Sequence, residues 1–273
     1  MRAGEPGWKP QRSKGLELLR AEILETLPWV VHGFGTRIGG RSRRKLLQAL
    51  NAGRMPLAGL RQIHSDVVHV VSAPPEEPPA GDAIATRQPG LLVAVQTADC
   101  VPILLADTKR RVVAAVHAGW RGTLARVAAK TLGRMRFEFG TRPEDVAAAL
   151  GPSIGRCCYE VGPEVAQAFS AQFAGAADWF DGPFEQLSAG AEPNPLPWLP
   201  MMPPGHDPPP ERVKLDLRAA NRRQLMDAGV SPRRIAVSGL CTACRTDLLF
   251  SYRREGAETG RMMAVIGIRA AAR

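Results

Sequence analysis

The sequence predicts an α/β fold in a single domain, and two observations lead to this prediction. Short apolar runs separated by turn residues indicate strands that are buried on both faces. Between these runs lie segments whose apolar residues recur at helical spacing. The 273 residues suffice for one large domain or two small ones. We expect residues 1–28 to form an N-terminal arm and a short helix, and residues 29–268 to form the single domain.

The first part of the chain carries one clear strand signal and several weaker ones. The short helix is expected over 16–27. Residues 29–37 predict a strand that runs into a glycine-rich turn, and 45–54 are helix-like. The β-branched residues of 60–73 predict a strand pair or one long bent strand.

The middle of the chain has the strongest strand signals, at residues 91–97, 102–107 and 111–117. Cys100 lies between two of these runs, and His117 lies at the end of the third. Functional residues are often placed where strands end. Both side chains are therefore candidate site residues.

A helix is expected after the HAGWRG phrase (117–122), with Thr123 as its N-cap and its N-terminus directed back toward His117. Its apolar positions follow the spacing of an amphipathic helix. They are Leu124, Val127, Ala128, Thr131, Leu132 and Met135.

The C-terminal part alternates strands and helices around a proline-rich segment. The ten prolines within about 183–210 predict a structured excursion or a disordered insert. A helix is expected over 216–229 and ends at Gly229. The remaining expected elements are a strand at 146–150, a loop over 151–165 leading to a helix that ends near 173, and strands at 234–240, 248–254 and 261–268.

The charge and composition exclude some classes of function. The net charge of +10 favours anionic ligands, but the basic residues are dispersed and aromatic residues are few, so we expect no dedicated nucleic-acid binding. No apolar run is long enough to span a membrane. Residues 1–15 lack the apolar segment of a secretory signal, so we expect a cytoplasmic protein whose five cysteines stay reduced.

Three soft-metal ligands, His64, Cys100 and His117, lie in distinctive phrases: QIHSD, TADCVP and HAGWRG. Two imidazoles and one thiolate can hold a zinc ion and leave its fourth position open, as in a catalytic site. The alternative is a core histidine, a buried free cysteine and an unrelated histidine. Cys100 and His117 could also form a thiolate–imidazolium nucleophile pair.

Charged residues near these ligands are candidates for catalysis and anion binding. Asp99 and Asp66 could orient a ligand imidazole or act as a general base, and each could equally be a turn residue. Arg121 at a helix start is suited to phosphate, and Arg37 and Arg61 are further anion-binding candidates. The alternative for these arginines is a solvated surface.

The other four cysteines give a weaker signal. Cys241 and Cys244 form a C-x-x-C pair that could be redox-active or half of a zinc site. No second C-x-x-C exists, and Cys157 and Cys158 are adjacent, which makes them a poor chelate. We interpret the C-x-x-C pair as structural.

Several phrases occur in the order found in one known family. They are GFGTRIGG (33–40), QIHSD (62–66), GDAIAT (81–86), TADCVPILLAD (97–107), VAAVHAGWRG (113–122), CCYEVG (157–162), LDLRAANRRQL (215–225), LFSYRR (249–254) and TGRMMAVIGI (259–268). On these phrases the chain resembles, over about 29–268, the YfiH-like laccase-domain family. Its members were long labelled multicopper polyphenol oxidases and later described as zinc-dependent purine nucleoside phosphorylases.

The resemblance implies an α/β/β/α-like arrangement of mixed β-sheets packed in layers with flanking helices. It implies a Zn²⁺ ion, with copper as a substitute, on His64, Cys100 and His117. It also implies phosphorolysis of adenosine, inosine and methylthioadenosine to base and ribose 1-phosphate, and deamination of adenosine. The expected partners are purine nucleosides and phosphate, in a monomer or small homo-oligomer. Within this scheme we expect Arg121 to hold phosphate, and Asp99 or Asp66 to move protons.

The chain departs from the family in three places. Only about twenty residues separate Ser42 from Gln62, where family members usually carry a longer segment, so a wall of the pocket could be missing. Ser153 replaces a family cysteine, and the segment 183–210 is longer than usual. The ligand phrases are intact.

Three rival functions remain at this point. A multicopper oxidase needs a histidine-rich trinuclear cluster, and His32, His69 and His206 cannot supply one. A cysteine hydrolase would use Cys100 with His117 and would be insensitive to chelators. A binding protein without turnover would fit the shortened 42–62 segment.

Overall fold

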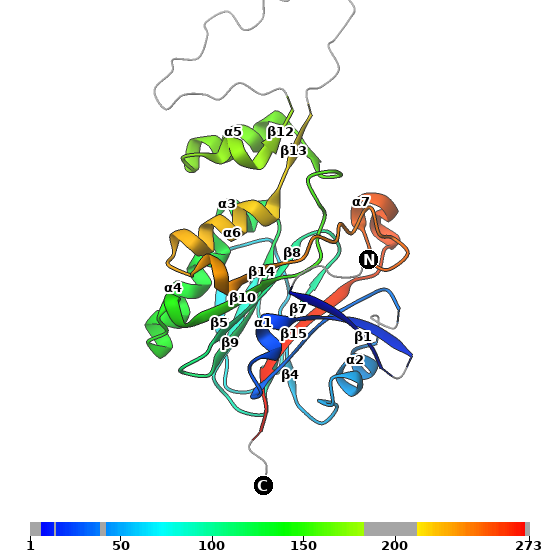
Figure 1. The fold of residues 1–273 in the computed structure, drawn as a ribbon, viewed down its shortest axis with the longest axis vertical. Coiled ribbons are helices and arrows are strands. Elements are labelled where there is room, and N and C mark those ends of the chain that lie inside the picture. The colour runs from blue at the N-terminus through cyan, green and yellow to red at the C-terminus, as the bar shows by residue number, and fades with distance from the viewer. Residues whose placement is uncertain (1–6, 14, 39–41, 183–211, 271–273) are drawn as a thin grey trace, which may run out of the picture.

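The computed structural model describes residues 7–13, 15–38, 42–182 and 212–270 (Figure 1). Within these residues, one six-stranded sheet holds the N-terminal hairpin and the C-terminal strand. In spatial order its strands are β1 (Trp8–Ser13), β2 (Leu16–Ala21), β3 (Val30–Gly35), β15 (Met262–Ile268), β7 (Leu92–Thr97) and β4 (Leu57–Ala58). It is called sheet A below.

A second six-stranded sheet, sheet B, contains the middle of the chain. In spatial order its strands are β14 (Ile235–Val237), β10 (Val146–Leu150), β8 (Val101–Asp107), β9 (Val112–Ala118), β6 (Ala83–Thr86) and β5 (Val68–Val70). A small third sheet contains β11 (Glu160–Val161), β13 (Val213–Leu215) and β12 (Phe180–Asp181). Antiparallel and parallel pairs occur in both large sheets, so the predicted mixed sheets are confirmed.

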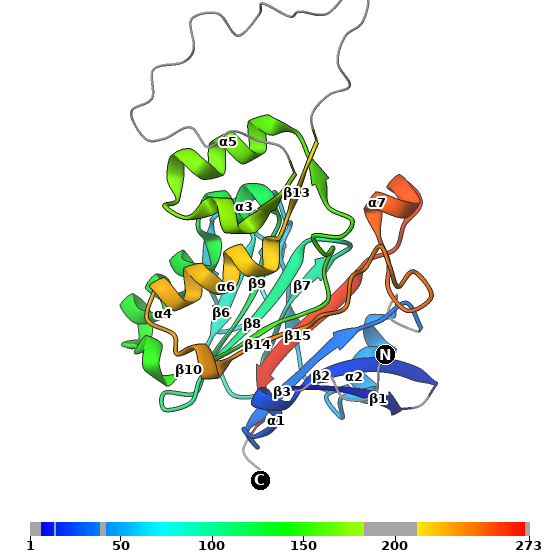
Figure 2. The ribbon, with the colours of Figure 1, turned by 45° about the horizontal axis from the view of Figure 1, so that its top comes forward.

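Helices cover the outer face of each large sheet. The helices of the described residues are α1 (Glu22–Glu25), α2 (Arg43–Ala49), α3 (Trp120–Leu124), α4 (Val127–Phe139), α5 (Pro163–Gln172), α6 (Leu217–Asp227) and α7 (Tyr252–Glu255). Four of them, α2, α4, α5 and α6, pack on the outer faces. Figure 2 shows α4, α5 and α6 on one side of sheet B, with sheet A and α2 on the opposite side. The predicted α/β/β/α layering is therefore confirmed. No helix in the described residues has the length and apolar character needed to cross a bilayer.

Three apolar layers hold this arrangement together. Between the two sheets, Leu104 and Val113 of sheet B pack in one cluster with Val93 and Ile266 of sheet A. A second cluster joins the other face of sheet B to α4, α5 and α6, and a third joins sheet A to α2. Burial on both faces explains why the strands at 91–97, 102–107 and 111–117 are almost continuously apolar.

The N-terminal prediction is wrong in its details. Residues 8–13 and 16–21 form the antiparallel hairpin β1–β2, and only Glu22–Glu25 is helical. Leu16 and Leu18 pack in the α2 cluster, whereas Leu19 and Ala21 pack between the sheets. Side chains that alternate between two apolar layers need a strand, and this tertiary demand overrides the helical propensity of the leucines.

The other corrections concern loops and helix ends. Residues 248–254 form a loop and the start of α7 rather than a strand, and only Val68–Val70 of 60–73 is strand. Thr123 is not an N-cap: it lies buried inside α3, and Arg126, in the left-handed region, precedes α4. The expected apolar face of α4 is confirmed from Val127 onward. The proline-rich stretch 183–210 lies outside the described residues.

Candidate functional site

The strand order of sheet B brings the three soft ligands together. Pro102 of β8 pairs with His117 of β9, so Cys100, just before β8, lies beside the end of β9. His64 comes from the loop between β4 and β5. The ligand atoms of the three residues lie within 4.8 Å of one another, and the two imidazole rings meet edge to face with centroids 4.9 Å apart. We call this group the histidine–cysteine centre.

A buried carboxylate, Asp82, positions two of these ligands. One of its oxygens lies 2.7 Å from Nδ1 of His117 and accepts the backbone N–H of His64 at 3.0 Å. The other accepts the backbone N–H and the hydroxyl of Ser65, at 2.6 and 2.8 Å. These hydrogen bonds to the backbone hold His64 in the left-handed region, at φ 59°. Such outer partners fix the orientation of metal-ligating imidazoles.

The same contacts polarise the centre. Burial opposes ionisation of the Cys100 thiol, but hydrogen bonds from His117 and His64 outweigh it and lower the pKa of Cys100 to about 7. Burial likewise opposes protonation of His117, but its bonds to Asp82 and Cys100 raise its pKa to about 9. For Asp82, burial is outweighed by its bonds to His117 and Ser65, and its pKa lies well below the usual range. The centre therefore favours a thiolate, which is the form that binds metals.

The backbone leaves room for close packing around the ligands at Gly119. A Cβ at this position would lie 3.0 Å from Sγ of Cys100 and 3.1 Å from Cδ2 of His64. A side chain at residue 119 would therefore crowd both residues and push them apart by a few tenths of an ångström. This accounts for the glycine in the HAGWRG phrase on steric grounds.

The centre lies at one wall of a cavity of about 740 Å³. Three arginine–aromatic pairs surround the opening: Arg121 lies over Trp120 (4.3 Å to the ring centroid), Arg253 over Tyr159 (5.2 Å) and Arg261 over Tyr252 (5.8 Å). Aromatic faces and cations together suit a ligand that has a planar base and a negative charge. The volume is that of a small-molecule site.

Asp99 is the candidate acid–base residue that lines this cavity. One of its oxygens accepts the hydroxyl of Thr242 at 2.5 Å, and the other accepts the backbone N–H of Arg253 at 2.7 Å. Its φ of 95° is uncommon for a residue with a side chain. The two hydrogen bonds hold it in this strained conformation at the wall of the cavity.

The other predicted charged residues lie elsewhere. Asp66 forms an ion pair with Lys130 of α4 and does not line the cavity. Arg37 pairs with Glu255 and lies over the ring of Phe250, and Arg61 is exposed beside the bridge to Ala80. Of the three candidate anion-binding arginines, only Arg121 lines the cavity.

Sequence reasoning missed five residues of the site: Asp82, Tyr159, Tyr252, Arg253 and Arg261. Asp82 directly precedes an apolar strand. Turn residues are common at such positions, so its place in the sequence did not indicate a functional role. Arg253 and Arg261 lie in segments expected as strands. The phrases GDAIAT, CCYEVG, LFSYRR and TGRMMAVIGI contained all of these residues, and they supplied the only available signal.

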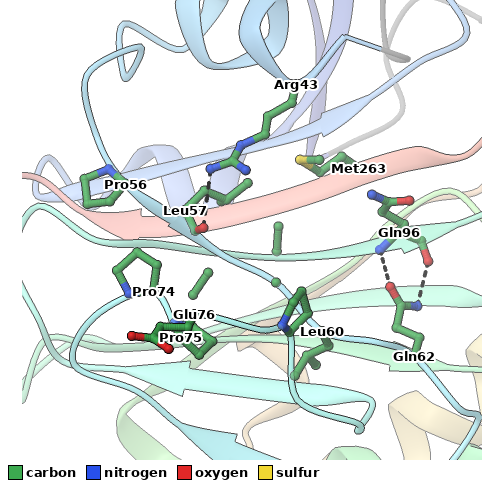
Figure 3. Close-up of a pocket in the computed structure, with 14 residues that line it drawn as sticks. Arg43, Pro56, Leu57, Leu60, Gln62, Pro74, Pro75, Glu76, Gln96 and Met263 are labelled. Atoms are coloured by element: carbon green, nitrogen blue, oxygen red, sulfur yellow. Dashed lines mark hydrogen bonds between the residues drawn. The ribbon is translucent and has the colours of Figure 1, made fainter.

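A second cavity, of about 490 Å³, adjoins the first and is lined in part by residues of the 42–62 segment (Figure 3). Arg43, Leu57 and Pro75 are among its lining residues. Gln62 and Gln96 line both cavities and are joined by two hydrogen bonds of 2.8 Å, from the amide of Gln62 to the carbonyl of Gln96 and from the N–H of Gln96 back to Gln62. This pair forms the wall between the two spaces.

Comparison with known proteins gives one consistent family. The model of the family described as "Multi-copper polyphenol oxidoreductase laccase" matches residues 39–269. A Deinococcus radiodurans protein named purine nucleoside phosphorylase is 38% identical, over 93% of this chain and 94% of that protein. A protein named adenosine deaminase RL5, from an unknown prokaryotic organism, is 37% identical over 66% of this chain and 59% of its own length. The crystal structure of the Bacillus licheniformis hypothetical protein YfiH superposes with a TM-score of 0.77 at 27% identity, covering 95% of this chain and 99% of that one.

Proposed function

The chain belongs to the family described as multi-copper polyphenol oxidoreductase laccase, and from this premise we propose that it is a zinc-dependent enzyme of purine nucleosides. In this proposal it cleaves adenosine, inosine and methylthioadenosine with phosphate to give the free base and ribose 1-phosphate. It also deaminates adenosine to inosine. The names of the Deinococcus protein and of RL5 support the two activities. We further propose a cytoplasmic location, which suits five free cysteines, and a monomer or small homo-oligomer.

One observation carries the proposal. The histidine–cysteine centre opens into a cavity that also presents Arg121, Arg253 and two tyrosine rings. Phosphorolysis needs these elements together: a site for a planar base, a cation for phosphate, and a polarising group between them.

The donor set fits zinc. Two imidazole nitrogens and one thiolate are ligands that zinc accepts, and three protein ligands leave a coordination position open toward the cavity. His117 meets Asp82 through Nδ1, which leaves its other ring nitrogen for a metal. A bound zinc ion supplies a Lewis acid and lowers the pKa of bound water. Copper is the substitute metal, because the same donors also bind it.

The residues around the centre have separate roles in this proposal. Arg121 holds phosphate near C1′ of the ribose, where a phosphate oxygen forms the new bond as the bond from C1′ to the purine nitrogen breaks. Tyr159 and Tyr252 contact the base. Asp99, oriented by Thr242 and the backbone of Arg253, moves the proton that the departing purine or the leaving ammonia requires. We assign this role to Asp99 rather than Asp66, because Asp66 faces Lys130.

Product analysis tests the proposal directly. Zinc-loaded protein and protein dialysed against a chelator are incubated with adenosine, with and without phosphate. We expect adenine only when phosphate is present, inosine in either case, and neither product after zinc removal until zinc is returned. Absence of both products from folded, zinc-loaded protein would contradict the proposal.

A second candidate function rests on a different feature of the same residues. Asp82, His117 and Cys100 follow one another as carboxylate, imidazole and thiol, and the lowered pKa of Cys100 suits a nucleophile in a cysteine hydrolase. Turnover of an amide or ester that survives chelation but not alkylation of Cys100 would favour it. Stoichiometric binding of a nucleoside without turnover would instead favour a binding protein.

The family description also raises copper-dependent oxidation of phenols. A trinuclear copper cluster needs many histidines in one place. Among the described residues, His32 is buried against the backbone of Ala21, and His69 contacts the carbonyl of Ala80. Neither lies in the histidine–cysteine centre, so we do not propose this chemistry.

A further inference from the structure

The four cysteines outside the histidine–cysteine centre come together in a second group. Cys157 and Cys158 lie in the loop after β10, and Cys241 and Cys244 lie in the loop after β14. All four sulfur atoms lie within 4.8 Å of one another. The sulfur of Cys244 is 3.4 Å from that of Cys158 and 3.6 Å from that of Cys157. We call this group the four-cysteine cluster.

Backbone contacts between the two loops build the cluster. Ser153 and Cys241 form a parallel bridge, and the N–H of Thr242 donates to the carbonyl of Ser153 at 3.0 Å. The chain turns tightly at Gly155, whose carbonyl accepts the N–H groups of Cys158 and Tyr159 at 2.9 and 3.0 Å. Because of this turn, two adjacent cysteines present both sulfurs to Cys244. The sequence argued against a chelate because the two cysteines are adjacent, whereas the structure brings both of their sulfurs to the C-x-x-C pair.

The spacing fits four thiolates around one metal ion. Zinc–sulfur bonds of about 2.3 Å place the sulfurs of a tetrahedral site roughly 3.8 Å apart. The separations of 3.4 and 3.6 Å from Cys244 to Cys158 and Cys157 are slightly below this value, and no separation in the cluster exceeds 4.8 Å. Without an ion, sulfurs at these separations hydrogen-bond to one another as thiols, and a metal ion that binds among them displaces their protons.

The surroundings of the cluster also suit a bound ion. The N–H of Gly155 donates to Sγ of Cys241 at 3.2 Å, as outer partners of metal-bound sulfur do. A Cβ at Gly155 would lie 3.2 Å from Sγ of Cys157 and 2.8 Å from the guanidinium of Arg218, so the loop wraps the sulfurs closely. Cys241 is buried, whereas Cys157 and Cys244 are exposed and give an ion a path of entry.

We propose that Cys157, Cys158, Cys241 and Cys244 bind a second zinc ion, which is structural. Four protein ligands close the coordination sphere, and none of the four cysteines lines the cavity of about 740 Å³ beside the histidine–cysteine centre. The observations that support this site do not include the histidine–cysteine centre or the activity proposed for it. Absence of nucleoside turnover would leave this proposal intact.

The second ion would stabilise two walls of the cavity. Thr242, between the two cysteines of the C-x-x-C pair, donates its hydroxyl to Asp99. Tyr159, next to Cys158, lines the cavity under Arg253. Joining the two loops through a metal fixes both side chains relative to the strands of sheet B. The role of the ion is thus to position residues, not to take part in chemistry.

Counting zinc per chain tests the proposal. The full-length protein is purified anaerobically under reducing conditions, supplied with zinc alone, and analysed by inductively coupled plasma mass spectrometry. We expect two zinc ions in the wild type, one in Cys244→Ser, one in His64→Ala and none when both substitutions are combined. Ser153→Ala is the matched control: the position is buried in the same loop, its hydroxyl has no hydrogen-bond partner among the described residues, and both ions should remain.

Two outcomes would overturn the proposal. One is a single zinc in the wild type that Cys244→Ser retains and His64→Ala loses. The other is a disulfide within the four-cysteine cluster of the protein isolated in this way, which free-thiol counting of the denatured chain would show and which would indicate a redox pair.

If Cys244→Ser does not fold, cobalt(II) titration of the wild type decides the question. Binding of two equivalents, one of them with the strong thiolate-to-cobalt absorption of a four-sulfur site, supports the proposal. Saturation at one equivalent with weak absorption contradicts it.

Discussion

The histidine–cysteine centre and the four-cysteine cluster are both groups of soft ligands, but they are built differently. The first lies at the ends of β8 and β9, mixes nitrogen and sulfur donors, and opens into a cavity of about 740 Å³. The second joins two loops, contains sulfur alone, and lies outside that cavity. Donor number and adjacent space, rather than the presence of soft ligands, separate a reaction centre from a structural one.

The two groups also differ in what holds them. In the first, the carboxylate of Asp82 orients an imidazole and a loop. In the second, backbone N–H groups and a bridge between Ser153 and Cys241 do so. A charged outer partner adjusts the chemistry of a ligand, whereas a backbone partner mainly fixes its place.

The largest expected effect comes from removing a ligand of the first centre. Cys100→Ser should lower adenosine turnover by more than the roughly 100-fold that loss of an outer partner can cost, because the metal loses its only thiolate there. Cys244→Ser, assayed at low temperature as the comparison, should lose much less activity and instead show a lower Tm. Equal losses of turnover in the two variants would remove the distinction between the groups.

The next effect concerns the outer partner. Asp82→Asn should weaken zinc binding at the histidine–cysteine centre by about 10- to 100-fold, because an amide accepts the Nδ1–H of the neutral His117 ring more weakly than a carboxylate and makes the ring a poorer ligand. Competition with a chromophoric chelator measures the affinity, and the zinc bound by the four-cysteine cluster serves as the internal reference. Weakening of both ions to the same extent would indicate general misfolding rather than a specific role.

A smaller effect is expected at the phosphate site. Arg121→Ala should raise the phosphate concentration needed for half-maximal phosphorolysis by roughly 10- to 100-fold, the value of one hydrogen bond to a charged group. Deamination of adenosine, which uses no phosphate, should change less. The same assay on Arg61→Ala tests the other exposed candidate, and a rise there alone would place phosphate near the loop of Gln62 instead.

The smallest expected effect is the pH dependence of the free energy of unfolding that His32 causes. The two buried histidines, His32 and His117, have pKa values shifted in opposite directions. Burial and the nearby Arg20 lower the pKa of His32 to about 3, whereas Asp82 keeps that of His117 high. The His32 side chain binds a proton more readily in the unfolded state than in the folded state. Its contribution to the free energy of unfolding is therefore complete above pH 6.5 and is lost as the pH falls from there toward 3. This contribution reaches at most about 2 kcal/mol at pH 5.

Urea unfolding at pH 7 and pH 5 measures the effect. His32→Gln keeps an acceptor for the N–H of Ala21 but cannot be protonated. Its stability should therefore depend less on pH than that of the wild type. An identical pH dependence in both proteins would show that His32 is not responsible.

The strands of sheet B could be predicted from sequence, and the N-terminal hairpin could not. The runs that became β7, β8 and β9 are apolar on both faces, and no solvent-facing alternative competes with that pattern. Residues 16–21 gave no such signal, because their leucines suit a helix as well as a strand. Their conformation was decided by pairing with β1 and β3 and by the two layers that they separate.

The sequence by itself determined the α/β class and the buried strands of the middle region, and it singled out His64, Cys100 and His117 as residues whose side-chain atoms zinc accepts. Only the tertiary structure decided that these three meet, because their distance depends on the register of β8 against β9 and on the grip of Asp82 on the loop of His64. It also decided that four cysteines from two distant loops converge, for which the sequence contained no signal. Local patterns record what each side chain can do, whereas contacts between distant segments depend on how whole layers pack, and no local pattern contains that information.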